Sequence, residues 1–128
     1  MALPQILLVE DESIVALDLT RRLTRWGYAV TRVASGDAAV EAADTLRPGL
    51  VLMDVRLPGS VDGLQAAAAI WARRPVPIVY LTGSADPVLL DGVQTPPPVL
   101  ILAKPFSEAA LRDILGQALA AWPGGSRP

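Results

Sequence analysis

Short apolar runs alternate along this chain with longer stretches in which apolar residues recur every three or four positions. Four of the runs, at residues 5–9, 50–53, 78–81 and 99–103, are almost entirely apolar, as expected of strands covered on both faces of a sheet. We expect these four strands to be central or near-central. A fifth run, residues 28–33, includes Thr31 and Arg32 and is typical of an edge strand. The alternation predicts an α/β fold around a mostly parallel sheet.

Four of the intervening stretches predict helices that each carry one apolar stripe. In chain order the stripes are Val15, Leu19, Leu23 and Trp26; Val40, Ala43 and Leu46; Leu64, Ala67, Ala68 and Trp71; and Leu111, Ile114, Leu115, Ala118 and Trp122. Gly27 can end the first helix, and Ser35 and Ser107 can cap the second and the last. A short helix of about two turns is also expected from Asp86 to the prolines at 96–98.

Composition limits both the architecture and the chemistry. The chain has 128 residues, of which 52% are hydrophobic, so we expect one domain at residues 1–122 followed by a flexible tail or the start of a linker at 123–128. It contains no cysteine and no histidine, which excludes disulfides, thiolate metal sites and the commonest general base. Any metal ion would therefore be bound by oxygen.

The charge balance argues against two classes of partner. Eleven basic and thirteen acidic residues leave a net charge of -2, which provides no strong basic field for direct nucleic-acid binding. No apolar run approaches the ~20 residues that span a bilayer, and the first four residues lack the basic region of a signal peptide. We expect a cytoplasmic protein without a membrane partner.

Polar residues directly follow four of the predicted strands in the sequence. Glu10, Asp11 and Glu12 follow the first strand, Asp54 the third, Thr82 the fourth and Lys104 the fifth. The carboxyl ends of parallel strands converge on the crevice where such sheets bind ligands. Glu10, Asp11 and Asp54 would together place up to three negative charges in one place, and Mg²⁺, a hard ion with oxygen ligands, fits such a cluster best.

Each of these residues alone has a plainer interpretation. An acidic turn such as residues 10–12 is usually a solvated surface, Asp54 could simply start a turn, and a threonine at a strand end is often only a β-former. It is their combination at successive strand ends that favours a functional site.

Four motifs make the chain resemble the response-regulator receiver domain from about residue 5 to residue 122. They are Leu-Leu-Val-Glu-Asp-Glu, Leu-Met-Asp-Val-Arg-Leu-Pro-Gly, Tyr-Leu-Thr-Gly-Ser and Lys-Pro-Phe. The resemblance implies a flavodoxin-like (βα)5 sandwich with the parallel strand order 2-1-3-4-5. It also makes the peptide bond before Pro105 a candidate for the cis form.

The resemblance further implies a phosphorelay function. Asp54 would accept a phosphoryl group from a phosphohistidine of a sensor histidine kinase or phosphotransfer protein, and Thr82 and Lys104 would contact that group. Mg²⁺, or alternatively Mn²⁺, would be bound by Glu10, Asp11, Asp54 and the main-chain carbonyl of Arg56. Since the chain has no histidine, it can only be the recipient. The domain would promote its own phosphorylation and dephosphorylation and would not be an enzyme with a separate substrate.

The chain departs from the family at the switch position. Receivers usually carry Tyr or Phe three residues before the lysine, where this chain has Ile101. One hypothesis is that phosphorylation instead orders the short helix near residue 86 and the triproline loop. The alternative is that Ile101 packs in the core of a domain that signals weakly or only drains phosphate.

Other positions are expected to tune the site or contact partners. The resemblance places Arg56, Gly83 and Ser84 beside the phosphoryl group, where they would affect access and phosphate lifetime. Ile14 and Leu17 lie off the apolar stripe of the first helix and are expected to form a kinase contact patch or an ordinary half-buried flank. The sequence leaves open the downstream target, homodimerisation, and whether the chain is complete or part of a longer protein.

Three other functions are alternatives for a chain of this fold class. A haloacid-dehalogenase-like phosphatase needs a general acid two residues after its nucleophile, where this chain has Arg56. A flavodoxin-like FMN binder needs a phosphate loop after the first strand, where residues 10–12 are acidic. The remaining alternative is a pseudo-receiver, which would act as a phosphorylation-independent protein-interaction module.

Overall fold

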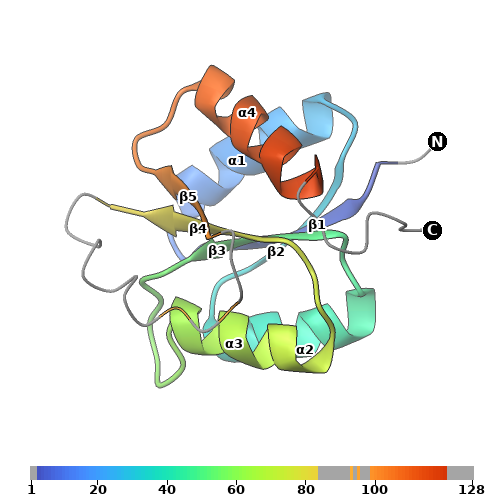
Figure 1. Cartoon of the computed structure of the whole chain (residues 1–128). Helices are drawn as coiled ribbons and strands as arrows, with labels where there is room; N and C mark the ends of the chain where they lie inside the picture. Colours follow the sequence, from blue (N-terminus) through green and yellow to red (C-terminus); the bar gives the residue numbers. More distant parts are fainter. Residues whose placement is uncertain (1–2, 84–92, 94, 96–98, 121–128) are drawn as a thin grey trace.

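The computed structural model describes residues 3–83, 93, 95 and 99–120, and these form a three-layer α/β sandwich (Figure 1). All neighbouring strands are parallel, in the order β2-β1-β3-β4-β5. The strands are β1 (Gln5–Val9), β2 (Ala29–Val33), β3 (Leu50–Asp54), β4 (Ile78–Thr82) and β5 (Leu100–Ala103). The predicted fold class and strand order are therefore confirmed.

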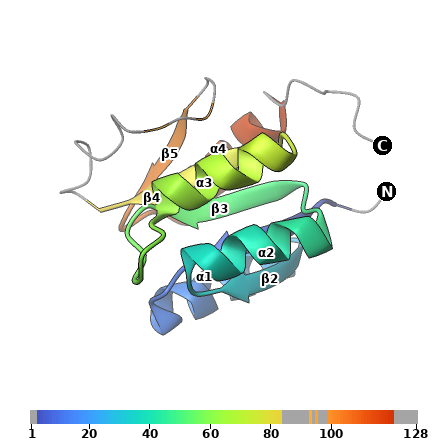
Figure 2. The ribbon, with the colours of Figure 1, turned by 90° about the horizontal axis from the view of Figure 1, so that it is seen from below.

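Two helices cover each face of the sheet in the described part of the chain. They are α1 (Ser13–Arg25), α2 (Gly36–Leu46), α3 (Gly63–Arg73) and α4 (Glu108–Ala120). Helices α1 and α4 lie on one face, and α2 and α3 lie side by side on the other (Figures 1 and 2). The short helix expected from Asp86 lies outside the described residues. None of the described helices has the length and apolar character needed to cross a membrane.

Three of the four described helices, α2, α3 and α4, begin at a capping side chain. Ser35 Oγ accepts a hydrogen bond of 3.2 Å from the Ala38 N–H, and Ser107 Oγ accepts one of 3.0 Å from the Ala110 N–H, as the sequence predicts. Helix α3 begins with a capping box that the apolar pattern does not predict: Asp62 accepts from the Gln65 N–H, and the Gln65 side chain accepts from the Asp62 N–H. All three caps use short polar side chains that precede an apolar stripe.

The core consists of two apolar clusters separated by the sheet. One lies under α1 and α4, and its largest members include Ile6, Leu8, Leu19 and Leu111. The other lies under α2 and α3 and includes Leu7, Val9, Met53 and Tyr80. Because successive strand residues point to opposite faces, the unbroken apolar sequence of β1 supplies both clusters, as its pattern predicted.

Two expectations about packing are wrong. The run at 99–103 is not a central strand, because β5 lies at the sheet edge and Ile101 is 40% exposed. The buried stripe of α3 consists of Ala66, Ala67 and Ile70, which is rotated by about one position from the predicted stripe that ended at Trp71. The alanine run of α3 carries little pattern of its own, so the sequence could not place this stripe.

Candidate functional site

The pairing register of the sheet brings the predicted polar residues to one place. Val9 pairs with Met53, so Glu10 follows β1 at the level of Asp54 on the neighbouring strand. Asp54 pairs with Leu81, which places Thr82 one step farther along β4. Thr82 pairs with Ala103, so Lys104 lies one further step beyond β5. Residues up to 94 positions apart therefore share the carboxyl edge of the sheet.

Glu10 is the most deeply buried charged residue of this group. Its side chain is 0% exposed, and its Oε2 accepts a hydrogen bond of 3.1 Å from the Glu12 N–H. Its Oε1 has no hydrogen bond of regular geometry, although Lys104 Nζ lies 2.9 Å away. A buried carboxylate oxygen with only this partner has capacity left for a cation.

Lys104 provides the positive charge at the centre of the site. Its Nζ lies 2.9 Å from Glu10 Oε1, 3.2 Å from Asp54 Oδ2 and 3.6 Å from Glu12 Oε1. Burial lowers the pKa of Lys104, but its contacts with Glu10 and Asp54 outweigh that effect and raise the pKa above its ordinary value. The side chain is therefore an ammonium at neutral pH. Its main-chain N–H donates a bond of 2.7 Å to the Thr82 carbonyl, and the Lys104–Pro105 bond is cis.

Asp54 ends β3 and is 4% exposed. Its Oδ1 accepts a hydrogen bond of 3.0 Å from the Arg56 N–H, and its Oδ2 accepts one of 3.2 Å from Lys104 Nζ. Burial raises the pKa of Asp54 to about 7; the bond from Arg56 opposes the shift, the charge of Glu10 adds to it, and Lys104 opposes it. Burial is therefore the main reason why Asp54 holds its proton more tightly than a solvated carboxyl group.

The site offers an oxygen-rich group of ligands for a metal ion. Carboxylate oxygens of Glu10, Glu12 and Asp54 lie within 4.8 Å of one another. Hard oxygen donors, and the unsatisfied Oε1 of Glu10, fit Mg²⁺. Asp11, the predicted ligand next to Glu10, is exposed and does not belong to this group, whereas Glu12, which was not predicted as a ligand, does. The sequence held no signal for Glu12, because β1 ends at Val9 and side-chain directions in the bend that follows do not follow from residue types.

The remaining predicted site residues differ in their settings. Thr82 is buried at the end of β4 and Gly83 follows it. The side chain of Arg56 is exposed, while its main-chain N–H contacts Asp54. Ser84 lies outside the described residues. Ile14 and Leu17 on α1 are 84% and 51% exposed, as their positions off the apolar stripe predicted.

The switch position lies at the surface. Ile101 is 40% exposed, so the alternative that it packs in the core is wrong. It pairs with Tyr80, whose ring is buried and whose hydroxyl lies 2.7 Å from Thr95 Oγ1. The aromatic ring beside the switch position therefore comes from β4 and is fixed by burial.

The chain is similar to known proteins in both sequence and structure. A family model described as the response regulator receiver domain matches residues 6–116. The transcriptional regulatory protein PdtaR of Mycobacterium tuberculosis is 38% identical over 104 residues, which are 80% of this chain and 50% of PdtaR. The chain thus spans about half the length of this curated relative.

Two solved structures are similar over nearly the whole chain. The N-terminal domain of a response regulator/sensory box/GGDEF three-domain protein from Carboxydothermus hydrogenoformans has a TM-score of 0.86 and 31% identity, and covers 96% of this chain and 99% of that one. The receiver domain of a sensor histidine kinase from Pseudomonas aeruginosa PAO1 has a TM-score of 0.78 and 38% identity, with coverage of 96% and 99%. That domain has a magnesium ion coordinated in its active-site cleft.

Proposed function

The chain belongs to the response regulator receiver domain family, and from that membership we propose that it accepts a phosphoryl group on Asp54 in a Mg²⁺-dependent reaction. The observation that carries the proposal is the setting of Asp54. Its buried carboxylate lies 3.2 Å from the Lys104 ammonium and within 4.8 Å of two further carboxylates that can hold the ion.

The chemistry is a phosphoryl transfer from phosphohistidine. An oxygen of Asp54 attacks phosphorus, the P–N bond breaks, and the leaving imidazole keeps the electron pair of that bond and takes up a proton. The product is an acyl phosphate on Asp54. Lys104 and the Thr82 hydroxyl would then contact the phosphoryl oxygens.

We assign the ion to Glu10, Asp54 and the Arg56 carbonyl. The further carboxylate is Glu12, which lies in the same group, or Asp11, which the resemblance implies. A bound Mg²⁺ or Mn²⁺ supplies charge neutralisation for the phosphoryl oxygens. Asp54 must also lose its proton before it can attack, and a dication beside it favours that form. Arg56, Gly83 and Ser84 are proposed to control access of water and the lifetime of the acyl phosphate.

The proposed phosphoryl donor is a sensor histidine kinase or a histidine phosphotransfer protein. Its docking surface is assigned to the exposed side chains of Ile14 and Leu17 on α1. The double variant Ile14→Ser/Leu17→Ser should slow phosphorylation by a kinase domain at least about tenfold and leave phosphorylation by phosphoramidate, a small donor, unchanged. Val99→Ser, at a 40% exposed apolar residue beside β5, is the matched control. Equal loss with both donors would contradict the docking role.

The proposed cellular role rests on the family. We propose a cytoplasmic two-component regulatory domain at residues 1–122 that passes its state to a downstream protein by conformational change, with residues 123–128 as a tail or linker. A homodimer is one form in which it could act. No nucleic-acid or membrane contact is assigned to this domain.

A second candidate is a pseudo-receiver that binds partners without phosphorylation. The exposed Ile101 favours this candidate, because isoleucine has no aromatic ring that could move between the surface and the pocket. The two candidates differ in whether the state of Asp54 reaches the rest of the domain.

The deciding experiment adds beryllofluoride and Mg²⁺ and follows amide NMR shifts, with Asp54→Asn as the control. A saturable, Mg²⁺-dependent change that is absent from the variant supports the phosphoacceptor. Shifts confined to the loops around Asp54 would mean that the site binds the analogue without a relayed change. The absence of any change in both proteins favours the pseudo-receiver.

A further inference from the structure

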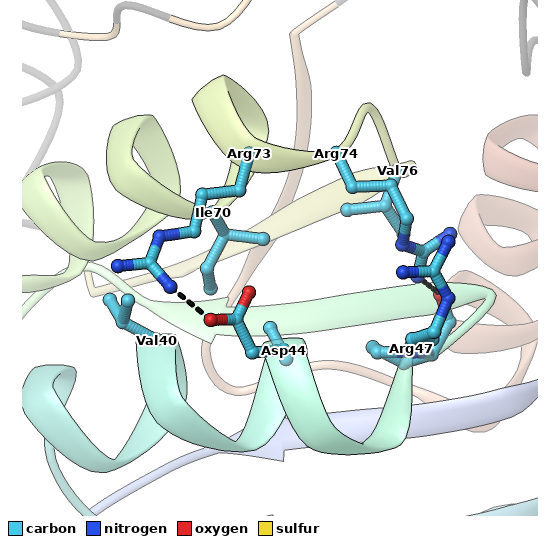
Figure 3. Close-up of a pocket in the computed structure, with 9 residues that line it drawn as sticks. Val40, Asp44, Arg47, Ile70, Arg73, Arg74 and Val76 are labelled. Carbon is cyan, nitrogen blue, oxygen red and sulfur yellow. Dashed lines mark hydrogen bonds and ion pairs between the residues drawn. The ribbon is translucent and has the colours of Figure 1, made fainter.

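A small pocket lies between the C-terminal ends of α2 and α3 (Figure 3). Its volume is ≈ 50 Å³, and its apolar lining includes Val40, Ile70 and Val76. Helix α2 ends just before β3 begins and α3 ends just before β4 begins, so the pocket lies at the amino ends of these strands. Asp54 lies at the carboxyl end of β3, which makes this a separate location.

Three arginines and one aspartate line the pocket, and their charges are unequally paired. Arg73 forms an ion pair with Asp44 at one end (Figure 3). Arg74 donates a hydrogen bond to the Pro48 carbonyl. Within the described part of the chain, the guanidinium of Arg47 makes no ion pair and no hydrogen bond. Two cationic groups are thus left without a carboxylate.

The two unmatched guanidinium groups lie together at the other end of the pocket (Figure 3). Burial lowers the pKa of Arg74, and the charge of the neighbouring Arg47 lowers it further, as expected where two like charges are close. Helix C-termini attract cations, and this explains why arginines occur here. It does not explain why the guanidinium groups of Arg47 and Arg74 lie next to each other while most of their N–H groups donate no hydrogen bond within the described residues.

The backbone at Arg47 adds an independent observation. Arg47 caps the C-terminus of α2 with φ of 48°, a left-handed conformation. Glycine usually takes this position because it has no Cβ to strain the backbone. Strain retained at a non-glycine residue points to a use for its side chain.

We propose that Arg47 and Arg74 form a binding site for a phosphate-like oxyanion, either inorganic phosphate or a phosphate monoester. A guanidinium presents planar pairs of N–H donors that match two oxygens of one phosphate group. Such an anion would bridge the two cations and cancel their repulsion. The volume of the pocket, ≈ 50 Å³, suits a group of a few heavy atoms.

The test is a titration of ¹⁵N-labelled full-length protein with inorganic phosphate and, separately, with glycerol phosphate. Sodium chloride keeps the ionic strength constant, and no Mg²⁺ is added. We expect saturable shifts of the amides at Arg47, Gly49, Arg74 and Val76. Tighter binding of glycerol phosphate would identify a monoester as the ligand, and equal or weaker binding would identify inorganic phosphate.

The variants Arg47→Gly and Arg74→Gln should each weaken binding at least about tenfold. Arg47→Gly also places the residue preferred in a left-handed conformation, so loss of binding cannot be ascribed to unfolding. Arg22→Gln on α1, which removes an exposed ion pair with Asp18, is the matched control and should leave binding unchanged. The proposal is overturned if sodium chloride alone causes the same shifts, or if Arg47→Gly binds phosphate as tightly as the unchanged protein.

Discussion

At the scale of single residues, Asp54 links the electrostatics of the site to the stability of the fold. Burial raises its pKa from 3.8 to about 7. Between these values the folded chain binds a proton that the unfolded chain has already released. The contribution of Asp54 to stability is therefore full below about pH 4 and is lost as the pH rises through 7.

This predicts that Asp54→Asn, which mimics the neutral carboxyl group, is more stable than the unchanged protein at pH 8 without Mg²⁺. The expected gain in free energy of unfolding is roughly 1–4 kcal/mol, and it should shrink towards pH 4. Urea denaturation from pH 4 to pH 8 measures it. Asp18→Asn on the surface of α1 serves as the control and should show no such pH-dependent gain. A constant difference across this pH range would contradict the buried, protonated Asp54.

Tyr80 makes a hydrogen bond that its residue type alone does not predict. Its buried hydroxyl lies 2.7 Å from Thr95 Oγ1 and ties the chain before β5 to β4. Tyr80→Phe keeps the ring and removes this bond, so it should lower the free energy of unfolding by about 1 kcal/mol. Tyr28→Phe is the matched control, because the Tyr28 hydroxyl has no hydrogen-bond partner among the described residues. Equal effects of the two substitutions in urea denaturation would show that the Tyr80 bond adds nothing.

Some features of the site residues can be predicted from the sequence, and others cannot. Glu10, Asp54, Thr82 and Lys104 could be placed together because each follows an apolar run, and the ends of parallel strands meet. The approach of Glu12 to Lys104 depends on side-chain directions in the turn after β1, which residue types do not specify. The exposure of Ile101 depends on which strand lies at the sheet edge.

At the scale of elements, α3 starts against the strand that carries Asp54. The Gly63 N–H donates a bond of 3.2 Å to the Val55 carbonyl. A Cβ at Gly63 would overlap the Asp54 carbonyl oxygen and lie 2.7 Å from the Val55 Cα, and neither backbone atom can move freely. A glycine is therefore required at the first position of α3.

Gly63→Ala should lower the free energy of unfolding by about 1–3 kcal/mol through this overlap. It should also shift the amide signals of Val55 and Arg56. Gly116→Ala is the matched control: a Cβ there meets nothing within 4 Å, and alanine favours the interior of α4. That substitution should raise stability by about 0.5–1 kcal/mol. Similar losses for both variants, measured by urea denaturation, would contradict the close packing at Gly63.

The periodicity of apolar residues predicts where helices and strands lie in the sequence better than it predicts which elements pack against one another. The stripe of α4 was found because Leu111, Ile114 and Leu115 stand among polar residues. In α3 four successive alanines leave no contrast between apolar and polar positions. Which of them are buried, here Ala66 and Ala67, therefore depends on packing alone. An apolar run likewise indicates the character of a strand but not its place in the sheet, so the sequence predicts an interior position for β5, which lies at the edge.

At the scale of the whole molecule, the sheet holds its charged clusters at opposite ends. The carboxyl end gathers Glu10, Glu12 and Asp54 around Lys104, an excess of negative charge. The amino ends of β3 and β4 lie beside three arginines and one aspartate, an excess of positive charge. The net charge of -2 conceals this separation, which arises only when the strands are placed side by side.

The excess of negative charge predicts that Mg²⁺ stabilises the whole fold. A dication that binds the folded chain alone adds RT ln(1 + [L]/Kd) to its stability, which is about 1.4 kcal/mol at ten times Kd. For a domain of this size that raises Tm by a few °C. The gain should be larger at pH 8 than at pH 5, because the pKa of Asp54, about 7, leaves its carboxyl protonated at the lower pH.

Differential scanning calorimetry at both pH values, with and without Mg²⁺, tests this prediction. Sodium chloride at matched ionic strength separates specific binding from screening, and Asp54→Asn should lose most of the gain at pH 8. If sodium chloride raised Tm as much as Mg²⁺, the acidic cluster would act only as a diffuse charge. A gain that was equal at pH 5 and pH 8 would instead mean that the ion binds without Asp54, and the three carboxylates would not form one site.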